Sequence, residues 1–293
     1  MRVTAEKLIR KMRGGAQAWL VQASTGDSYV VKFRENAQHR RILINEWIAG
    51  CFLEQLGLCA AKTAQIHVSS EWLERARGEG LSIAVGNATR TISPGPHLGS
   101  RVPVDPETTA IYDYLPDAIL RDVRNRNHFH GMLAFDQWTA NADARQAIFF
   151  RGRCREFVPE ANFGPGQRGF IAMMIDHGYC FQGPDWRLDD LPRQGTFVRP
   201  AAYEQIAGWE DFEPWLTRIL HFPDSAVDRA LSGIPSSWLE PGEEQLLEQL
   251  MLELLRRRSR VPDLIEACRN ARPDFFPNWH PSPYVPLAAS RTS

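Results

Sequence analysis

The sequence predicts an α+β protein with two lobes, a sheet-rich N-terminal lobe and a helical C-terminal lobe. Before Pro116, apolar residues recur mostly in short runs and alternations typical of strands. After Pro116 they recur mainly at helical spacing, and the chain from Pro200 onward is helical in pattern. We therefore expect lobes at residues 1–116 and 117–280, followed by an extended Pro- and Ser-rich tail at 281–293.

Composition narrows the class of protein. Of the 293 residues, 43% are hydrophobic and 24% charged, values typical of a globular chain and not of collagen, coiled coils or disordered proteins. A net charge of -1 offers no general attraction to nucleic acid or membranes, and no apolar run approaches the ~18 residues of a membrane span. We expect a cytoplasmic protein that binds neither nucleic acid nor a membrane directly. Its five scattered cysteines predict reduced thiols.

A β-hairpin is the first element that the pattern indicates. Residues 16–23 and 28–33 flank the turn signal Ser-Thr-Gly-Asp at 24–27. Alternation along the second strand places Lys32 on the face opposite the aromatic and apolar residues at 29, 31 and 33.

A helix is expected next, at residues 40–56, with Glu46 beside its apolar stripe and Gly57 as its stop. Further strands are expected at 60–68 and 110–115, whereas 70–80 has no clear pattern and 81–101 is ambiguous between strand and turns.

The second lobe begins with a helix expected over 117–138. The elements expected after it are a polar loop at 141–146, a strand at 148–150, a turn at 151–153, a short strand to 157, an apolar strand at 170–175 that runs into Asp176, and a long helix at 243–258.

Polar residues occur along the chain in the order that phosphoryl transfer requires. A nucleotide triphosphate needs close backbone approach to its phosphates, a lysine held by a carboxylate, acidic ligands for Mg2+ and a group that orients the attacking hydroxyl. The candidates for these roles are the turn at Gly14 and Gly15, the strand lysine Lys32, the helix glutamate Glu46, and the loop aspartates Asp143 and Asp176.

Each candidate also has an ordinary structural explanation. A Gly-Gly pair usually forms only a turn, and a strand lysine near a helix glutamate is commonly a surface pair. The loop around Asn141 and Asp143 is equally compatible with an Asx-rich turn, and Asp176 with a cap. The order of the set, more than any one member, favours a nucleotide site.

Five segments together resemble the HipA-like kinase family, distant relatives of protein and phosphoinositide kinases. They are GGAQAWLVQASTGDSYVVKF, NEWIAGCFLEQLGL, GPHLGSR, FDQWTANADARQAIF and MMIDHGYCF. The resemblance covers about residues 10–280. It implies a two-lobed protein-kinase-like fold with ATP and Mg2+ bound between the lobes.

The resemblance also implies roles for individual residues. Lys32 would bind phosphate with Glu46 as its partner, Asp143 would orient the acceptor hydroxyl, and Asp176 would bind Mg2+. The phosphate-covering turn would contain Gly14, Gly15 and Gln17, and the adenine-contacting hinge would lie at Tyr112, Tyr114 and Leu115.

One position departs from the family pattern. Typical relatives carry an asparagine metal ligand five positions after the catalytic aspartate, where this chain has Ile148. The amide of Gln146 or Asn141 is a possible replacement, and without a replacement the site would bind nucleotide without efficient transfer.

Three functions follow as hypotheses. The first is an ATP- and Mg2+-dependent kinase acting on Ser or Thr of a protein substrate. The second is a nucleotide-binding pseudokinase with a regulatory role toward a partner protein. The third is a kinase of a small cationic acceptor, for which the acidic residues Asp185, Asp189 and Asp190 are candidate contacts.

Overall fold

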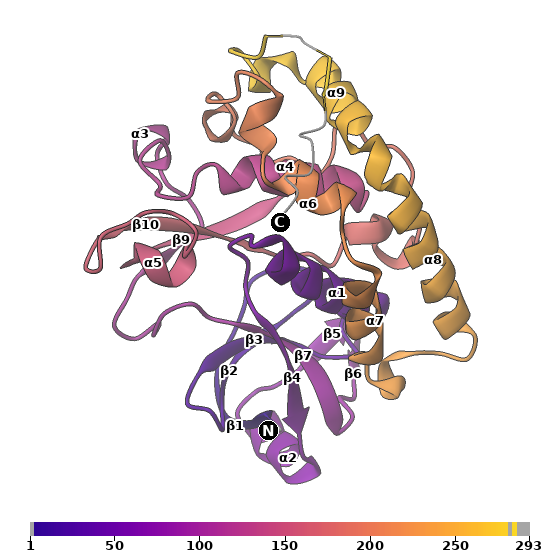
Figure 1. Ribbon diagram of the computed structural model, residues 1–293. Helices are drawn as coiled ribbons and strands as arrows, with labels where there is room; N and C mark the ends of the chain where they lie inside the picture. Colours follow the sequence, from indigo (N-terminus) through magenta and orange to yellow (C-terminus); the bar gives the residue numbers. More distant parts are fainter. Residues whose placement is uncertain (1–2, 281–282, 286–293) are drawn as a thin grey trace.

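Five strands from the first part of the chain close into a barrel in the order β1-β2-β3-β7-β4. The computed structural model describes residues 3–280 and 283–285, so most of the tail predicted at 281–293 lies outside the described residues. Figure 1 shows the barrel at one end of the molecule. Its strands are β1 (Val3–Lys11), β2 (Trp19–Ala23), β3 (Ser28–Lys32), β4 (Thr63–Val68) and β7 (Gly95–Arg101).

Strand β1 is not among the strands that the sequence predicts. Its outward side chains are mostly Lys, Arg and Glu, so its apolar alternation is weak. It is a strand because of long-range pairing, antiparallel to β2 and parallel to β4, where Val3 pairs with Ile66. Barrel closure of this kind leaves no local signal in the sequence.

The barrel has its own hydrophobic core, which also includes residues of one helix and one small hairpin. Residues 70–80, unassigned from the sequence, form helix α2 (Ser70–Gly78), whose Trp72 and Leu73 are buried in this core. The ambiguous segment 81–101 contains the hairpin of β5 (Ile83–Val85) and β6 (Ala88–Arg90), followed by β7.

Helix α1 (Arg41–Leu56) lies between the barrel and the C-terminal helices (Figure 1). It is buried on nearly every side, and it ends where Gly57 adopts a left-handed conformation with φ 69°. Its apolar residues join those of the C-terminal helices in one large core. The helix therefore presents polar residues, Asn45 and Glu46, to neighbouring segments without exposing them to water.

A second sheet of three strands lies beside α1, in the order β10-β9-β8. Its strands are β8 (Ile111–Tyr112), β9 (Gln146–Arg153) and β10 (Arg168–Ile175). The turn predicted at 151–153 is wrong, because those residues continue β9 and pair with β10 up to Arg168. The short strand predicted to 157 is also wrong: helix α5 (Cys154–Phe157) occupies that segment.

The helix predicted over 117–138 is interrupted. It consists of α3 (Asp117–Leu120) and α4 (His128–Trp138). Between them the chain bonds to β10: the backbone N–H of Arg124 donates to the carbonyl of Phe170, and Asn125 makes two side-chain hydrogen bonds to the backbone of Ala172. Between α3 and α4, hydrogen bonds to β10 therefore take the place of those that a continuous helix would form.

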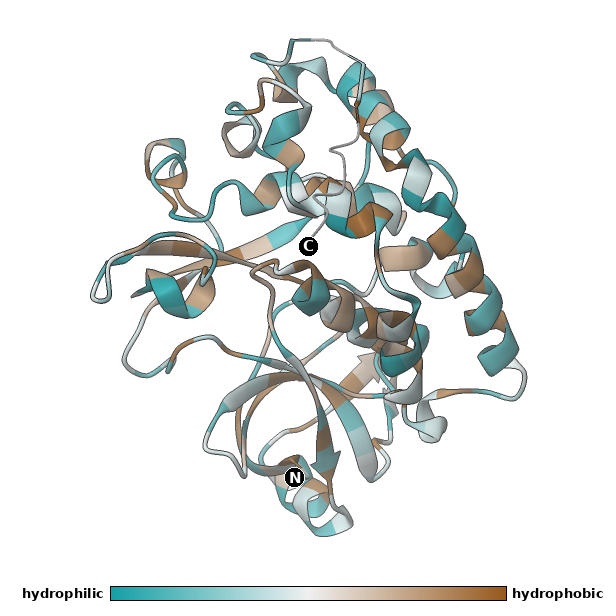
Figure 2. Cartoon of the chain, viewed as in Figure 1, coloured by the Kyte–Doolittle hydropathy of each residue, from teal (hydrophilic) through white to brown (hydrophobic). Residues whose placement is uncertain are grey.

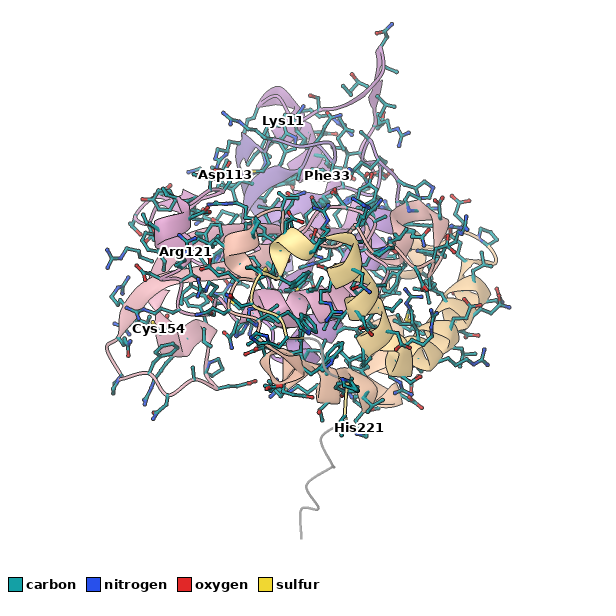
Figure 3. All side chains as sticks on the ribbon, turned by 90° about the horizontal axis from the view of Figure 1, so that it is seen from above. Lys11, Phe33, Asp113, Arg121, Cys154 and His221 are labelled. Atoms are coloured by element: carbon teal, nitrogen blue, oxygen red, sulfur yellow. The ribbon has the colours of Figure 1, made fainter. Side chains whose placement is uncertain are left out.

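The remaining helices are α6 (Trp215–Leu220), α7 (Asp224–Ser232), α8 (Glu243–Arg257) and α9 (Val261–Ala271). The predicted helix at 243–258 is confirmed as α8, along which hydrophilic and hydrophobic bands alternate in Figure 2. Figure 3 shows Lys11 of the barrel and His221, just after α6, on opposite sides of the molecule. All five cysteines are free, and within residues 3–280 and 283–285 no helix is long and apolar enough to span a membrane.

Candidate active site

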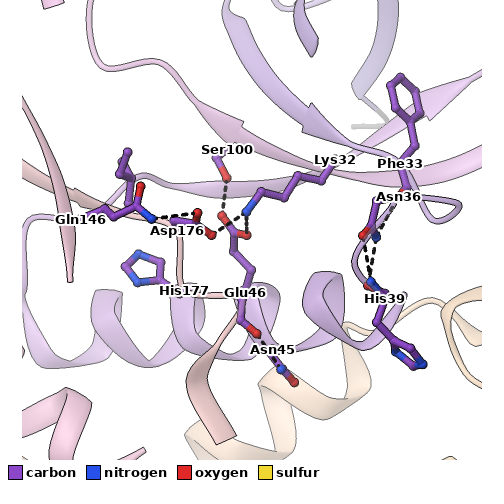
Figure 4. A network of polar contacts seen from close by, with 12 residues as sticks. Lys32, Phe33, Asn36, His39, Asn45, Glu46, Ser100, Gln146, Asp176 and His177 are labelled. Atoms are coloured by element: carbon purple, nitrogen blue, oxygen red, sulfur yellow. Dashed lines mark hydrogen bonds and ion pairs between the residues drawn. The ribbon is translucent and has the colours of Figure 1, made fainter. Parts of the chain in front are cut away.

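Three charged residues from three separate elements meet between the barrel and the second sheet. Lys32 ends β3, Glu46 lies on α1, and Asp176 follows β10 directly. The Lys32 Nζ atom lies 2.6 Å from Glu46 Oε2 and 2.8 Å from Asp176 Oδ1 (Figure 4). A fourth residue, Ser100, which the sequence did not suggest, donates its hydroxyl to Glu46 Oε1 at 3.1 Å.

The partners keep Lys32 charged although it is buried. Burial alone would lower the pKa of Lys32, but the two carboxylates outweigh burial and raise it. Burial raises the pKa of Glu46, against the opposing charge of Lys32. For Asp176 burial favours a higher pKa, yet the contact with Lys32 lowers it. Its side chain is 35% exposed, so Asp176 is a carboxylate open to a ligand.

Gln146 is the amide that reaches Asp176. Gln146 is the first residue of β9 and pairs with Ile175, the last residue of β10. Its side chain therefore lies close to Asp176, which follows Ile175. Its Nε2 atom lies 3.4 Å from Asp176 Oδ2. Ile148 lies two residues further along β9 and packs with the apolar cluster under this sheet.

The loop between α4 and β9 positions Asp143. The Asp143 N–H donates to Asn141 Oδ1 at 3.1 Å, and the Asp143 carboxylate accepts from the N–H of Ala144 at 2.7 Å. The loop is therefore an Asx-type turn, which was the ordinary structural explanation considered for it from the sequence. The Asp143 side chain is exposed. Asn141 is buried and also donates to Asp136 Oδ1 at 2.9 Å.

Arg145 joins this loop to the segment of Asp176. Its side chain has no exposed surface and forms a two-pronged ion pair with Asp136, equally buried, through Nε at 2.8 Å and through Nη2. Its Nη1 donates to the carbonyl of Ile175 and to His177 Nδ1, each at 2.9 Å. The sequence placed Arg145 in the polar loop but gave no signal that Asp136, inside an apolar helix, is its partner.

The Gly-Gly turn connects β1 to β2 at the edge of the barrel. Gly14 has a φ of 115°, a conformation that favours glycine, and a Cβ at Gly15 would lie 3.2 Å from Gln38 Nε2. The Gln17 amide bonds to both backbone groups of Ala84 on β5, at 2.5 and 3.0 Å. Gln17 therefore ties the turn to the β5–β6 hairpin.

The residues expected to form the hinge differ in their exposure. Tyr112 and Tyr114 are exposed, and their described ring contacts are with Phe170 and Arg199. Leu115 is buried in the large core. None of the contacts in the described part of the chain joins these three residues to Lys32.

A cavity of about 570 Å3 opens beside the barrel. Ser28, at the opposite end of β3 from Lys32, lines it, and none of Lys32, Glu46 and Asp176 does. Other residues around it are Ile9, Leu20, Gln22 and the segment 101–107, which leaves β7. Its size is within the ~300–1,000 Å3 of small-molecule sites.

Comparison of the coordinates with solved structures identifies a kinase-like fold. The Golgi casein kinase superposes with a TM-score of 0.53 at 13% identity, covering 92% of this chain and 74% of that chain. The Golgi casein kinase with Mn/ADP bound gives 0.47 at 12% identity (92% and 74% covered), and the Helicobacter pylori proinflammatory kinase CtkA 0.47 at 12% (90% and 95%). Only the first exceeds 0.5, and the fold comparison rests on it.

Sequence comparison then gives the family. The profile of the HipA-like kinases matches residues 5–261, and the chain belongs to this family. The family resemblance inferred from the five segments is confirmed. A search of curated protein sequences finds no significant match.

Proposed function

We propose that this protein is an ATP- and Mg2+-dependent kinase that phosphorylates Ser or Thr hydroxyls of a protein substrate. The observation that carries the proposal is the contact of Lys32 with Glu46 and Asp176 at once. A lysine held by a helix glutamate next to an accessible aspartate is the arrangement that grips nucleotide phosphates and their metal ion.

The donor set fits a nucleotide with its metal ion. Bound Mg2+-ATP would supply the phosphoryl group and neutralise charge on it. Lys32 would hold the phosphates, and the backbone at Gly14 and Gly15 would cover them. We keep Tyr112, Tyr114 and Leu115 as the proposed contacts of the base, because the cavity lined by Ser28 is lined by none of Lys32, Glu46 and Asp176.

We assign the metal ion to Asp176 and Gln146. Mg2+ is commonly held by one or two protein oxygens together with phosphates and water. Rotation of the Gln146 amide would turn its oxygen toward the position that its nitrogen now occupies beside Asp176. Asn141, whose amide is engaged at both ends, would instead hold the loop that carries Asp143.

Asp143 is our candidate for the group that orients the acceptor hydroxyl. It is exposed at the loop tip, and its backbone is held by Asn141 and by the N–H of Gly195, which donates to the Asp143 carbonyl at 3.1 Å. An exposed carboxylate on a fixed loop can accept the hydroxyl proton while the acceptor is positioned.

A protein acceptor is favoured over a small cationic one. Two of the three acidic residues suggested for a cation are already paired, Asp189 with Arg187 at 2.6 Å and Asp190 with Arg257 and Arg260 at 2.8 and 2.7 Å. The near-zero net charge agrees with a cytoplasmic protein that acts on another protein and does not bind nucleic acid or a membrane directly.

The test is incubation with γ-labelled ATP and Mg2+, comparing wild type with Asp143→Ala, Asp176→Ala and Lys32→Met. A kinase labels itself or an added protein, and Asp143→Ala reduces the rate by roughly 100-fold or more while still binding ATP. ATP-dependent stabilisation that needs Lys32 but gives no label at any metal concentration supports the pseudokinase. If ATP neither stabilises the protein nor labels it, both hypotheses are wrong.

A further inference from the structure

The segment after Asp176 is tied to helix α1 by one buried amide. Asn45 precedes Glu46 on that helix and has no exposed surface. Its Nδ2 atom donates to three backbone carbonyls of the segment, those of Gly178 at 2.8 Å, Cys180 at 3.1 Å and Gly183 at 2.8 Å. Its Oδ1 atom accepts the indole N–H of Trp186 at 2.8 Å.

The orientation of the Asn45 amide is determined by its partners. The indole nitrogen of Trp186 is only a donor, and backbone carbonyls are only acceptors. Exchanging the Asn45 oxygen and nitrogen would oppose like groups at all four contacts. Every hydrogen-bonding group of this side chain is therefore committed to the segment 178–186.

The segment that Asn45 holds has an unfavourable backbone conformation. Phe181, Gln182 and Trp186 have φ values of 58°, 55° and 52°, in the left-handed region that non-glycine residues rarely adopt. Such conformations persist only where the surroundings impose them. The carbonyls of Cys180 and Gly183, on either side of the first two, accept hydrogen bonds from Asn45 Nδ2.

Other contacts join the same two parts. A Cβ at Gly178 would lie 2.3 Å from Ile42 Cγ2, so the segment passes directly against α1. The guanidinium of Arg41 lies 4.0 Å from the ring centre of Trp186 and donates to the carbonyl of Pro184 at 2.6 Å. Asn45 is the central, fully buried member of this interface. In Figure 4 it lies on α1 next to Glu46, which reaches toward Lys32.

We propose that Asn45 is a positioning residue that locks the helix of Glu46 to the segment of Asp176. The lock keeps both carboxylates on Lys32 at the same time, so the phosphate and metal sites are assembled without a separate activating event. This inference rests on the proposed function for its catalytic consequence, because the lock matters for transfer only if Asp176 binds the metal ion.

The experiment compares Asn45→Ala with Asn125→Ala as a matched control. Asn125 is equally buried, and among the described residues its side chain bonds to the backbone of Ala172 and to no residue of α1. We measure the Mg2+ concentration that gives half-maximal ATP-dependent stabilisation and transfer. Asn45→Ala is expected to raise it about tenfold or more, as loss of groups that orient metal ligands does, whereas Asn125→Ala changes it less than about twofold at a similar loss of melting temperature. Equal shifts in the two variants, or none in Asn45→Ala, overturn the proposal.

Two additions keep the test decisive. Trp186→Phe removes the indole donor to Asn45 but keeps an aromatic ring beside Arg41, and it is expected to raise the Mg2+ requirement about twofold. It therefore replaces Asn45→Ala if that variant does not fold. Hydrogen exchange without nucleotide separates this inference from the proposed function. If ATP neither stabilises nor labels the wild type, the proposed function is wrong. The positioning role of Asn45 then still predicts that the amides of residues 181–183 exchange faster in Asn45→Ala than in Asn125→Ala. Equal exchange rates overturn the lock.

Discussion

Arg145 shows, at the scale of a single residue, how a fully buried cation is tolerated. Its guanidinium contacts both carboxylate oxygens of Asp136 and two groups of the Asp176 segment. Burial lowers the pKa of Arg145, but the charge of Asp136 outweighs burial and raises it. Burial and the positive charge of Arg145 also hold the pKa of His177 well below its usual value, so His177 is neutral and accepts a hydrogen bond.

Substitutions at Arg145 and Asp136 can distinguish the contribution of Arg145 to protein stability from its contribution to the position of the Asp176 segment. Arg145→Met leaves the buried carboxylate of Asp136 unpaired and is expected to cost about 3–5 kcal/mol of unfolding free energy. The double variant Asp136→Leu with Arg145→Met should recover much of that stability but not phosphate transfer, because the carbonyl of Ile175 is still unbound. Urea unfolding and the labelling assay measure the two effects. Recovery of transfer together with stability would show that Arg145 does not position the site.

Gln146 is the second residue whose role depends on a neighbour distant in sequence. Its side chain is exposed and touches Asp176, so substitution should leave the fold intact. We expect Gln146→Ala to raise the Mg2+ concentration for half-maximal activity about tenfold, and Gln146→Glu to keep it near or below the wild-type value, because a carboxylate is the stronger Mg2+ ligand. Gln249→Ala, at an exposed glutamine of α8, is the control; a shift equal to that of Gln146→Ala would remove the metal role.

At the scale of elements, the turn between β1 and β2 is held by its own backbone and by a side chain. The turn at 12–17 closes with the hydrogen bonds from Met12 N–H to the carbonyl of Ala18 and from Gln17 N–H to that of Gly14. The Gln17 amide then joins the turn to β5. The hairpin of β5 and β6 thus braces the turn that covers the phosphates in our proposal.

Releasing this brace should weaken nucleotide binding without changing the chemical step. Gln17→Ala removes the two hydrogen bonds to Ala84 and the one from Lys11. The two bonds to β5, at about 1 kcal/mol each, correspond to an increase of about tenfold or more in the KM for ATP at nearly unchanged kcat. Gln17→Glu retains the acceptor for Ala84 N–H and should give a smaller increase. Steady-state kinetics at saturating Mg2+ test this, and a fall in kcat with unchanged KM would contradict it.

At the scale of the whole molecule, the largest hydrophobic core contains residues from both sides of Pro116. Apolar residues of α1, such as Ile48 and Phe52, share one core with Phe129 and Trp138 of α4. Phe52 stacks with Trp138 at a ring separation of 5.8 Å. The lobe boundary at Pro116 stays a prediction, and α1 is fixed by packing to the helical side as well as to the barrel.

Two buried neutral histidines link the stability of the whole protein to pH. Burial lowers the pKa of His97 to about 3 and of His128 to about 4, from an ordinary value near 6.5. Between pH 6.5 and 4 the unfolded chain binds protons that the folded chain does not, so unfolding free energy falls as pH falls through this window. Each histidine is expected to contribute about 2–3 kcal/mol to the loss.

Urea unfolding at pH 4.5 to 7.5 measures this dependence. His128→Gln is the informative variant, since the Gln amide oxygen can accept the Cys59 N–H that now donates to His128 Nδ1 at 3.0 Å. The variant should lose stability more slowly on acidification, by about one proton in the slope. Identical slopes for wild type and His128→Gln would show that His128 does not contribute.

The family and the mixed class of the fold could be predicted from the sequence. So could elements whose apolar residues follow a local period, such as the hairpin that ends at Lys32, helix α1 and helix α8. These depend on neighbours within a few turns or one strand, and that information is local. The order of Lys32, Glu46 and Asp176 along the chain made them candidates for one site, and the structure brings their side chains into contact.

Contacts between residues far apart in the sequence became known only from the tertiary structure. The pairing of β1 with β4, the break between α3 and α4, and the partners of Asn45 and Arg145 depend on contacts between distant segments. The placement of the hinge at Tyr112, Tyr114 and Leu115 came from the family resemblance and stays a prediction. A period along the chain records which face is buried; it does not record what buries that face.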